Sequence, residues 1–297
     1  MNFVELGKKI YRLDNPREAH RFVVFIARCM LHPQRMDRLE KFFSQSEFLK
    51  KISDAYPFFY EQATRAFFYY KSTFNERIEL IESHINFLMQ TFDENFLLKL
   101  YNGEKIELWK MPLDETLGEL QLLLCVETGQ RKESLMSLML RLSDGTPIYQ
   151  MMFWISKNTL WIGAMQGPNV EDSREVIKKI TKKCHAYRTK NLILYATQIF
   201  ARSIGLEKIF AVTNYGYYAN NHVRIDRKLK TSFSDFWQEC GGTLTDDKRF
   251  CELPLNEIRK SEEEIPVRKR AVYRRRFELL DELNLTVTEK IQNFRKE

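Results

Sequence analysis

Two side chains in this sequence have the types and positions that general acid–base chemistry uses. Glu127 ends an alternating apolar segment, and His222 follows the last apolar segment of the central region. A carboxylate or imidazole at a strand end is a candidate base for an attacking nucleophile, as acyl transfer requires. The alternative interpretation is an exposed strand end and a histidine that has no partner in the sequence.

A short basic turn supplies a second candidate site, which suits phosphate binding. His185, Arg188 and Lys190 stand just ahead of an apolar helix that begins near Asn191. Helix N-termini attract anions because their first amide groups lack partners and the helix dipole is positive there. The alternative is a solvated basic turn.

Gln166 and Gly167 end the strand that precedes this basic turn. Ligands collect at strand ends beside crossover helices, so we expect both residues to line the same crevice as the turn. The alternative is that glycine and the following Pro168 only stop the strand.

The densest cluster of charge lies near the end of the sequence. Its basic members are Arg268, Arg270, Arg274, Arg275 and Arg276. Such a cluster fits an anionic partner, either phosphate groups or the head groups of a membrane surface. A solvated helix paired with the acidic residues 262–264 is the alternative. No helix-turn-helix, zinc-finger or aromatic RNA-binding pattern accompanies the cluster, which disfavours sequence-specific nucleic-acid binding.

Length and composition restrict the class of protein. The chain has 297 residues, of which 44% are hydrophobic and 29% charged, and its formal net charge is +7. These values fit a globular protein with an anionic partner. Five cysteines without CxxC spacing indicate reduced thiols and no metal site. No signal-peptide pattern occurs, and no apolar run approaches the roughly 20 residues that span a bilayer, so we expect a cytoplasmic protein or one peripheral at the inner membrane.

The elements that must position these residues are helical in the first third of the chain. Residues 16–102 contain apolar residues at helical spacing, including an aromatic-rich segment over 58–70. The sequence predicts two capping boxes, Thr73 with Glu76 and Thr91 with Glu94. A polar connection is expected over residues 104–118, which contain Pro112 and Gly118.

After this connection the apolar residues alternate. An antiparallel meander is predicted from about residue 120 to residue 165, with turns at Asp144-Gly145 and at residues 156–158. Helices are expected over residues 173–184 and 191–204, and then a strand over 207–214. The second helix is apolar on nearly every side, so we place it at the centre of the domain under the sheet. The strand after a crossover helix is expected to be parallel to its neighbour.

Five segments form a recognisable series. They read LWIGAMQGP (160–168), KNLILYATQIFARSIG (190–205), IFAVTN (209–214), FWQECGG (236–242) and IPVRKRAVYRRRFELLD (265–281). In this order they resemble the VirK/YbjX family of Gram-negative bacteria, whose domain has no established chemistry. The resemblance implies a role in envelope stress, virulence or resistance to antimicrobial peptides, and it supplies no catalytic residues.

The order meander, strand, apolar helix and strand is also similar to the core of the GCN5-related N-acetyltransferases. This resemblance implies acyl coenzyme A as the cofactor, with its pyrophosphate at the turn before the central helix, here residues 185–191. The turn departs from that family in lacking its glycines, and an extra helix intervenes over residues 173–184. Likeness of fold does not by itself establish an activity.

These observations predict an α+β protein. A helical N-terminal domain over residues 1–110 is followed over residues 111–297 by an acetyltransferase-like mixed sheet with packed helices and a basic helical tail. The expected function is that of a VirK-like protein acting as an acyl-CoA-dependent acyltransferase. The alternative is a non-enzymatic accessory protein that binds anionic lipid or a protein partner through its basic tail.

Overall fold

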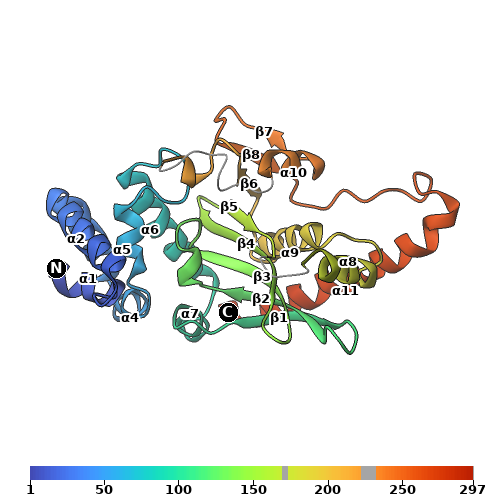
Figure 1. Cartoon of the computed structure of the whole chain (residues 1–297), viewed down its shortest axis with the longest axis horizontal. Helices are drawn as coiled ribbons and strands as arrows, with labels where there is room; N and C mark the ends of the chain where they lie inside the picture. Colours follow the sequence, from blue (N-terminus) through green and yellow to red (C-terminus); the bar gives the residue numbers. More distant parts are fainter. Residues whose placement is uncertain (169–172, 222–231, 297) are drawn as a thin grey trace.

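The computed structural model describes residues 1–168, 173–221 and 232–296 (Figure 1). Before the sheet, these ranges contain α1 (Phe3–Ile10), α2 (Pro16–Leu31), α3 (Pro33–Phe43), α4 (Glu47–Ala55), α5 (Phe58–Thr64), α6 (Phe74–Thr91) and α7 (Glu94–Tyr101). The strands are β1 (Ile106–Pro112), β2 (Glu119–Cys125), β3 (Met136–Leu142), β4 (Pro147–Ser156), β5 (Thr159–Gln166), β6 (Lys208–Val212), β7 (Thr243–Leu244) and β8 (Phe250–Leu253). The later helices are α8 (Ser173–Lys183), α9 (Thr189–Ser203), α10 (Phe233–Glu239) and α11 (Arg270–Gln292), with short 3-10 turns η1 (Thr128–Gln130), η2 (Tyr218–Asn221) and η4 (Val267–Lys269).

The strands form one mixed sheet in the order β1-β2-β3-β4-β5-β6-β8-β7. Strands β5 and β6 are parallel, and the other neighbours are antiparallel. The turn between β4 and β5 uses Lys157 and Asn158 with positive φ angles of 51° and 57°, which suits the right-handed twist of a tight hairpin. The predicted α+β fold class is therefore confirmed, with helices first and a mixed sheet after them.

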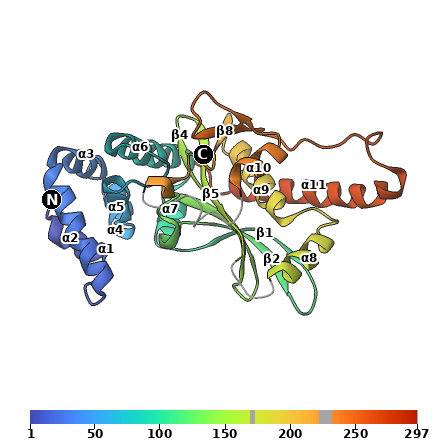
Figure 2. The ribbon, with the colours of Figure 1, turned by 45° about the horizontal axis from the view of Figure 1, so that its top comes forward.

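Helix α9 is the most buried helix of the sheet region, because it lies between the sheet and α11 (Figure 2). Phe153 of β4 packs against Phe200 of α9, with ring centroids 5.5 Å apart. The next residue of β4, Trp154, points to the other face, since neighbouring side chains on a strand alternate. Helix α6 packs on β4 as well, and its residue Leu80 meets Trp154 in a cavity on that second face.

The hydrophobic core continues from the N-terminal helices into the sheet without interruption, from Ile10 to Ile291. An ion pair also joins the two parts, because the buried carboxylate of Glu61 in α5 contacts the half-buried Arg131 beside η1 at 2.5 Å. Strand β1 crosses the predicted boundary at residue 110. The division into domains 1–110 and 111–297 stays a prediction. No helix in the described ranges is long and apolar enough to cross a bilayer.

The prediction of a connection over residues 104–118 is wrong in its first half, where β1 lies. Ile106, Leu108 and Trp109 are buried there. The register with β2 shifts between Glu107 and Trp109. This irregularity interrupts the period of two, which hides the strand in the sequence.

The aromatic segment 58–70 is helical only as far as Thr64. Phe68 then adopts a positive φ of 68°, and its N–H donates to the carbonyl of Lys132 at 2.7 Å. Contacts with the sheet region therefore override the helical spacing of the aromatic residues.

Of the two predicted capping boxes, the box of Thr73 and Glu76 is confirmed. The second is wrong, because Thr91 is the last residue of α6 and Asp93 caps α7 by accepting from the N–H of Phe96 at 2.8 Å. An aspartate close to the helix start takes the capping role from the more distant threonine.

Candidate functional site

The two parallel strands at the centre of the sheet separate partway along their length. Strands β5 and β6 pair from Thr159 with Lys208 to Ile162 with Ala211. Residues 163–166 of β5 continue with no partner on the β6 side among the described strands. We call this place the β5–β6 split. Its open edge leaves backbone N–H and C=O groups that need partners.

A bulge explains the separation. The register between β4 and β5 shifts after Met152, so that Gly163 is one residue more than the ladder needs. A bulge bends its strand and increases the local twist. Glycine is required there, because a Cβ at Gly163 would lie 2.0 Å from the carbonyl oxygen of Glu133.

Arg188 and Lys190 stand at the start of α9. Arg188 is the N-cap residue, and no side chain caps the first turn. Both cations contact Glu239, with the carboxylate oxygen 2.7 Å from Arg188 Nη2 and 3.4 Å from Lys190 Nζ. Lys190 Nζ also lies 4.5 Å from the centroid of the Phe236 ring. Two cations share one carboxylate, so the start of α9 keeps a formal excess of one positive charge (2 − 1).

Gly167 comes to the same end of the sheet as Arg188. A Cβ at Gly167 would lie 3.3 Å from the ring of Tyr149 in β4, so glycine lets the chain pass close to this ring. Burial raises the pKa of Tyr149, and the charge of Arg188 opposes that rise. Gln166 is otherwise engaged, since its Oε1 accepts from Gln130 Nε2 at 2.8 Å.

The turn before α9 and the basic cluster meet each other. Nε and Nη2 of Arg276 donate to the carbonyl of His185 at 3.1 and 3.0 Å, and Nη2 donates to the carbonyl of Ala186 at 3.2 Å. His185 and Ala186 both have positive φ angles, 50° and 59°. The guanidinium of Arg276 also lies 4.2 Å from the centroid of the Tyr273 ring. Arg276 therefore fixes the shape of the turn.

A cavity of about 530 Å³ lies beside this turn, between α9, the end of α10 and α11. Asn191 lines it, with Nδ2 3.8 Å from Cys240 Sγ and with Oδ1 buried and unpaired within the described part of the chain. The hydroxyl of Tyr187 donates to Glu257 at 2.5 Å, and burial together with this carboxylate raises the pKa of Tyr187. Acidic and basic side chains both face this cavity.

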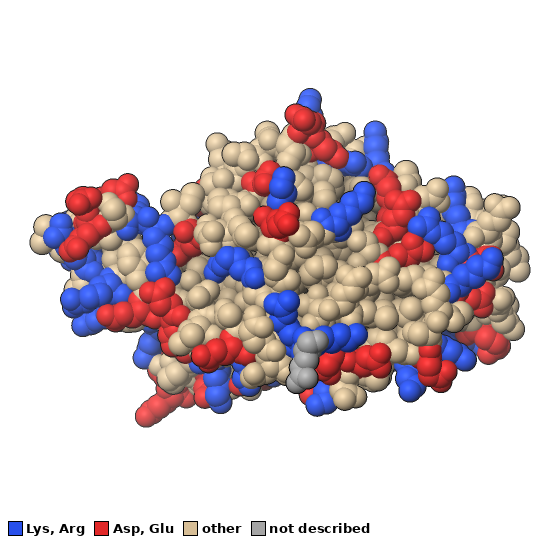
Figure 3. Space-filling model, turned by 180° about the vertical axis from the view of Figure 1, so that it is seen from behind, with Lys and Arg blue, Asp and Glu red and all other residues tan. Residues whose placement is uncertain are grey.

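The other members of the basic cluster are more exposed. Arg270 lies 3.5 Å from Glu262 and donates to the carbonyl of Ile265. Arg268, Arg274 and Arg275 are exposed to solvent. In Figure 3 the end of the molecule that holds the start of α11, on the left, carries basic and acidic side chains together. The second half of α11 is part of the core through its apolar residues, so the cluster is not on a free tail.

The two predicted bases lie elsewhere or outside the described ranges. Glu127 follows β2 and pairs with Lys105 at 2.7 Å. Strands β3 and β4 separate β2 from β5, a spacing of roughly 14 Å for three strand-to-strand steps. The structure does not bring Glu127 to the split. His222 is outside the described residues.

Sequence reasoning missed Glu239, which holds both cations of α9. The position lies in the FWQECGG segment, but nothing in its spacing indicates contact with Arg188. It also missed a cavity on the other face of the sheet, floored by Trp154 and Trp161. The sequence did indicate this pair of tryptophans, because the predicted turn at residues 156–158 makes Trp154 and Trp161 cross-strand partners.

Relatives of the chain are bacterial. It is 34% identical over 156 residues to "Uncharacterized protein YbjX" of Escherichia coli (strain K12). The aligned region covers 50% of this chain and 47% of that protein. It is 30% identical over 200 residues to an "Uncharacterized protein" of Haemophilus influenzae, 66% of each chain. A more distant similarity, 23% over 188 residues, links it to "Membrane protein LapB" of Mannheimia haemolytica, covering 62% of this chain and 79% of that protein.

The chain thus spans about half of the first of these relatives and two thirds of the second. No solved structure matches it at a significant level. Residues 14–289 match the family described as "Protein of unknown function (DUF535)". The predicted resemblance to the YbjX group is confirmed, and this chain belongs to the DUF535 family.

Proposed function

We propose that the protein transfers an acyl group from a coenzyme A thioester to an acceptor, with the donor bound in the β5–β6 split. The observation that carries this proposal is the end of parallel pairing at Ile162 and Ala211 while β5 runs on to Gln166. An open strand edge suits an extended ligand that contains amides, because such a ligand completes the missing ladder. The pantetheine arm of coenzyme A has two amide groups.

The start of α9 supports the same site. Its first amide groups have no side-chain cap, and Arg188 and Lys190 add two cations, which together favour a diphosphate. Glu239 now holds both cations. A diphosphate would compete with this carboxylate, so Glu239 is expected to weaken donor binding.

In this reaction the amine or hydroxyl of the acceptor attacks the acyl carbon, the carbon–sulfur bond breaks, and the thiol leaves with a proton. Backbone N–H groups on the open edge of β5 suit the carbonyl oxygen, where negative charge develops during the attack. The general base stays a prediction, with Glu127 and His222 as the sequence-based candidates. The acceptor belongs to the bacterial envelope or is a protein.

Calorimetry with coenzyme A tests the proposal. Arg188→Ala/Lys190→Ala should weaken binding about tenfold or more, since each charge-assisted hydrogen bond contributes about 1.5–3 kcal/mol and half-exposure reduces this. Glu239→Gln should strengthen binding. Arg12→Ala/Lys51→Ala removes two exposed cations, one between α1 and α2 and one in α4, and is the control for net charge. No binding to the wild type at millimolar concentration would refute the donor site, and equal weakening by both double variants would refute the assigned residues.

A second candidate function rests on η4 and the first half of α11. Val267 and Val272 are 76% and 40% exposed beside Arg268, Arg274 and Arg275. Apolar and basic side chains together suit an anionic membrane surface at the inner membrane or a protein partner. The name of the Mannheimia haemolytica relative, membrane protein LapB, supports an envelope role, as does the expected link to envelope stress and antimicrobial-peptide resistance.

Vesicle flotation distinguishes this candidate. Arg268→Gln/Arg274→Gln/Arg275→Gln should reduce binding to vesicles that contain anionic phosphatidylglycerol, and added salt should reduce wild-type binding. Binding that does not respond to the substitutions or to salt would leave only a solvated helix face.

A further inference from the structure

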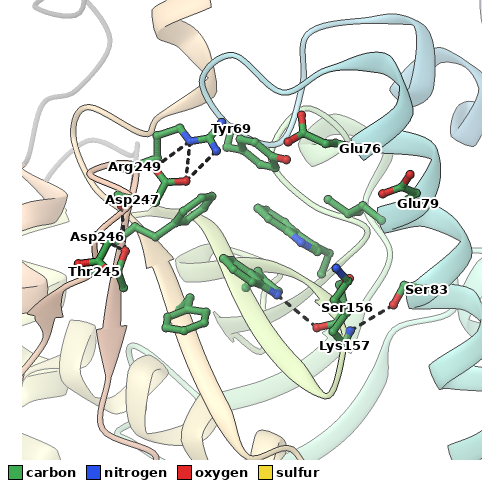
Figure 4. Close-up of a pocket in the computed structure, with 15 residues that line it drawn as sticks. Tyr69, Glu76, Glu79, Ser83, Ser156, Lys157, Thr245, Asp246, Asp247 and Arg249 are labelled. Atoms are coloured by element: carbon green, nitrogen blue, oxygen red, sulfur yellow. Dashed lines mark hydrogen bonds and ion pairs between the residues drawn. The ribbon is translucent and has the colours of Figure 1, made fainter.

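A cavity of about 460 Å³ lies on the face of the sheet opposite α9 (Figure 4). Its floor is aromatic, and the central pair is Trp154 of β4 and Trp161 of β5. These cross-strand partners have rings that are parallel within 2°, with centroids 6.3 Å apart. Phe210 of β6 continues the floor, with its centroid 4.7 Å from that of Trp161. Trp161 and Phe210 are only half-buried, so ring surface faces the cavity.

The floor is held in place by its surroundings. The indole N–H of Trp161 donates to the carbonyl of Ser156 at 3.3 Å. Phe250 packs edge-on against Trp161, with centroids 4.9 Å apart and an interplanar angle of 77°. A ligand that lies on Trp161 would therefore meet a preformed surface, which reduces the entropy lost on binding.

Two acidic rims face each other across this floor. Figure 4 shows Glu76 and Glu79 of α6 on one side, and Asp246 and Asp247 of the turn before β8 on the other. Asp246 and Glu79 are exposed, and a carboxylate oxygen of Glu79 lies 3.8 Å from Arg38 Nη1. The rims belong to different elements, so their charges are spread along the cavity.

The cavity is negative although the chain is positive. Four carboxylates and two cations, Lys157 and Arg249, line it, which gives a formal charge of −2 (2 − 4) in a chain of +7. Arg249 is already engaged, because Nη2 lies 2.7 Å from Asp247 and the guanidinium carbon 4.9 Å from the Tyr69 ring centroid. The charge of Arg249 is therefore already paired within the protein.

We propose that this cavity binds a linear aliphatic polyamine. The ammonium groups at the two ends would meet the two acidic rims, and the methylene chain would lie on Trp161 and Phe210. Aromatic faces attract ammonium groups as well as methylene groups, so the floor suits the whole length of the ligand. Two or more positive charges on the ligand match the local charge of −2.

Other classes of small ligand fit less well. An anion would meet the net negative charge of the lining, and a neutral chain would leave both acidic rims without a partner. Of the two lining cations, Lys157 is the one without a side-chain partner in the described part of the chain, and it would compete with an ammonium ligand. The proposal is independent of acyl transfer, since it uses the opposite face of the sheet.

Calorimetry with spermidine at low salt tests the proposal, with 1,8-octanediol as a neutral probe of similar length. Spermidine should bind with one molecule per chain, and octanediol should not bind measurably. Glu79→Gln/Asp246→Asn removes one exposed carboxylate from each rim and should weaken spermidine binding about tenfold, given up to about 1 kcal/mol for each exposed charge pair.

Two further variants make the test specific. Glu104→Gln/Glu115→Gln removes two exposed carboxylates outside the cavity and should leave the affinity unchanged. Lys157→Asn removes the competing cation and should strengthen binding roughly two- to threefold. Asparagine tolerates the positive φ of 51° at this turn position, so the hairpin should be kept.

The proposal is overturned if spermidine does not bind at millimolar concentration, or if octanediol binds equally well. It is also overturned if Glu79→Gln/Asp246→Asn and the Glu104/Glu115 control behave alike while both remain folded by circular dichroism. Weaker spermidine binding by Glu79→Gln/Asp246→Asn together with tighter binding by Lys157→Asn supports the proposal. A loss of structure would weaken binding in both variants.

Discussion

His84 ties helix α6 to strand β4 through a buried imidazole. Its Nδ1 accepts a hydrogen bond from the N–H of Ile155 at 3.0 Å, and its side chain has no exposed surface. Nε2 is buried without a hydrogen-bond partner in the described part of the chain. Burial lowers the pKa of His84 from 6.5 to about 3, so the folded protein holds it neutral.

This depressed pKa makes stability fall as the pH falls. Below about pH 6.5 the unfolded chain binds a proton at His84 that the folded chain does not bind until about pH 3. One proton contributes about 1.4 kcal/mol per pH unit in that window. Between about pH 7.5 and pH 5, His84 alone should therefore lower the free energy of unfolding by about 2 kcal/mol. The contribution of neutral His84 to the free energy of unfolding is fully present well above pH 6.5 and is lost as the pH falls toward 3.

Urea unfolding followed by tryptophan fluorescence measures this at both pH values. His84→Asn keeps an acceptor near the position of Nδ1 but cannot take up the proton. Its free energy of unfolding should be lower than that of the wild type near pH 7.5, because a smaller side chain leaves a cavity. It should lose about 2 kcal/mol less than the wild type on going to about pH 5.

His84→Leu separates the hydrogen bond from the titration. It leaves the N–H of Ile155 unpaired, at a cost of about 1–3 kcal/mol that is independent of pH. Should His84→Asn lose as much stability between the two pH values as the wild type, burial of a neutral imidazole would not be the cause of the pH dependence.

Two further substitutions test how the helices and the split are held. Glu61→Gln removes the fully buried carboxylate that pairs with Arg131, whose side chain is 15% exposed, and should lower the free energy of unfolding by about 3 kcal/mol in urea titrations. A change under about 1 kcal/mol would mean that the pair adds little to stability. Gly163→Ala places a Cβ 2.0 Å from the carbonyl oxygen of Glu133 and should lower the free energy of unfolding by about 1–3 kcal/mol. Gly129→Ala is the control, because a Cβ there meets nothing within 4 Å. Equal melting temperatures for the two variants would argue against the close approach at Gly163.

The strands of the sheet were predictable where alternation was regular and turns had strong residues. The turn at Asp144-Gly145 and the hairpin at residues 156–158 fixed the meander, because both positions carry residues that tolerate positive φ. Strand β1 was not predictable, since its irregular pairing breaks the period of two. The end of α5 at Thr64 was missed because contacts with Lys132 decide it, and these lie far away in sequence.

The candidate site was predictable only in its local part. Arg188 and Lys190 precede an apolar helix, and this spacing is enough to place them at a helix start. Their shared partner Glu239 and the contact of Arg276 with His185 join residues about 50 and 90 positions apart, for which a single sequence gives no signal. The acidic rims around Trp161 were hidden for the same reason, because α6 and the turn before β8 meet only in the folded chain.

The two proposed ligands use different parts of the β5–β6 strand pair. Coenzyme A would bind at the split, and spermidine would bind on one face of the paired part, so the two proposals can be tested separately. Trp161 and Phe210 belong to the paired part of β5 and β6, whereas the split begins after Ile162. Side chains alternate along a strand, so Trp161 and Phe210 in the floor of the cavity face α6, and the residues next to them on each strand face α9. The rim variant Glu79→Gln/Asp246→Asn should therefore leave coenzyme A binding unchanged, and Arg188→Ala/Lys190→Ala should leave spermidine binding unchanged. If either double variant weakened both ligands in the folded protein, the two would share one site, and the assignment of separate faces would be wrong.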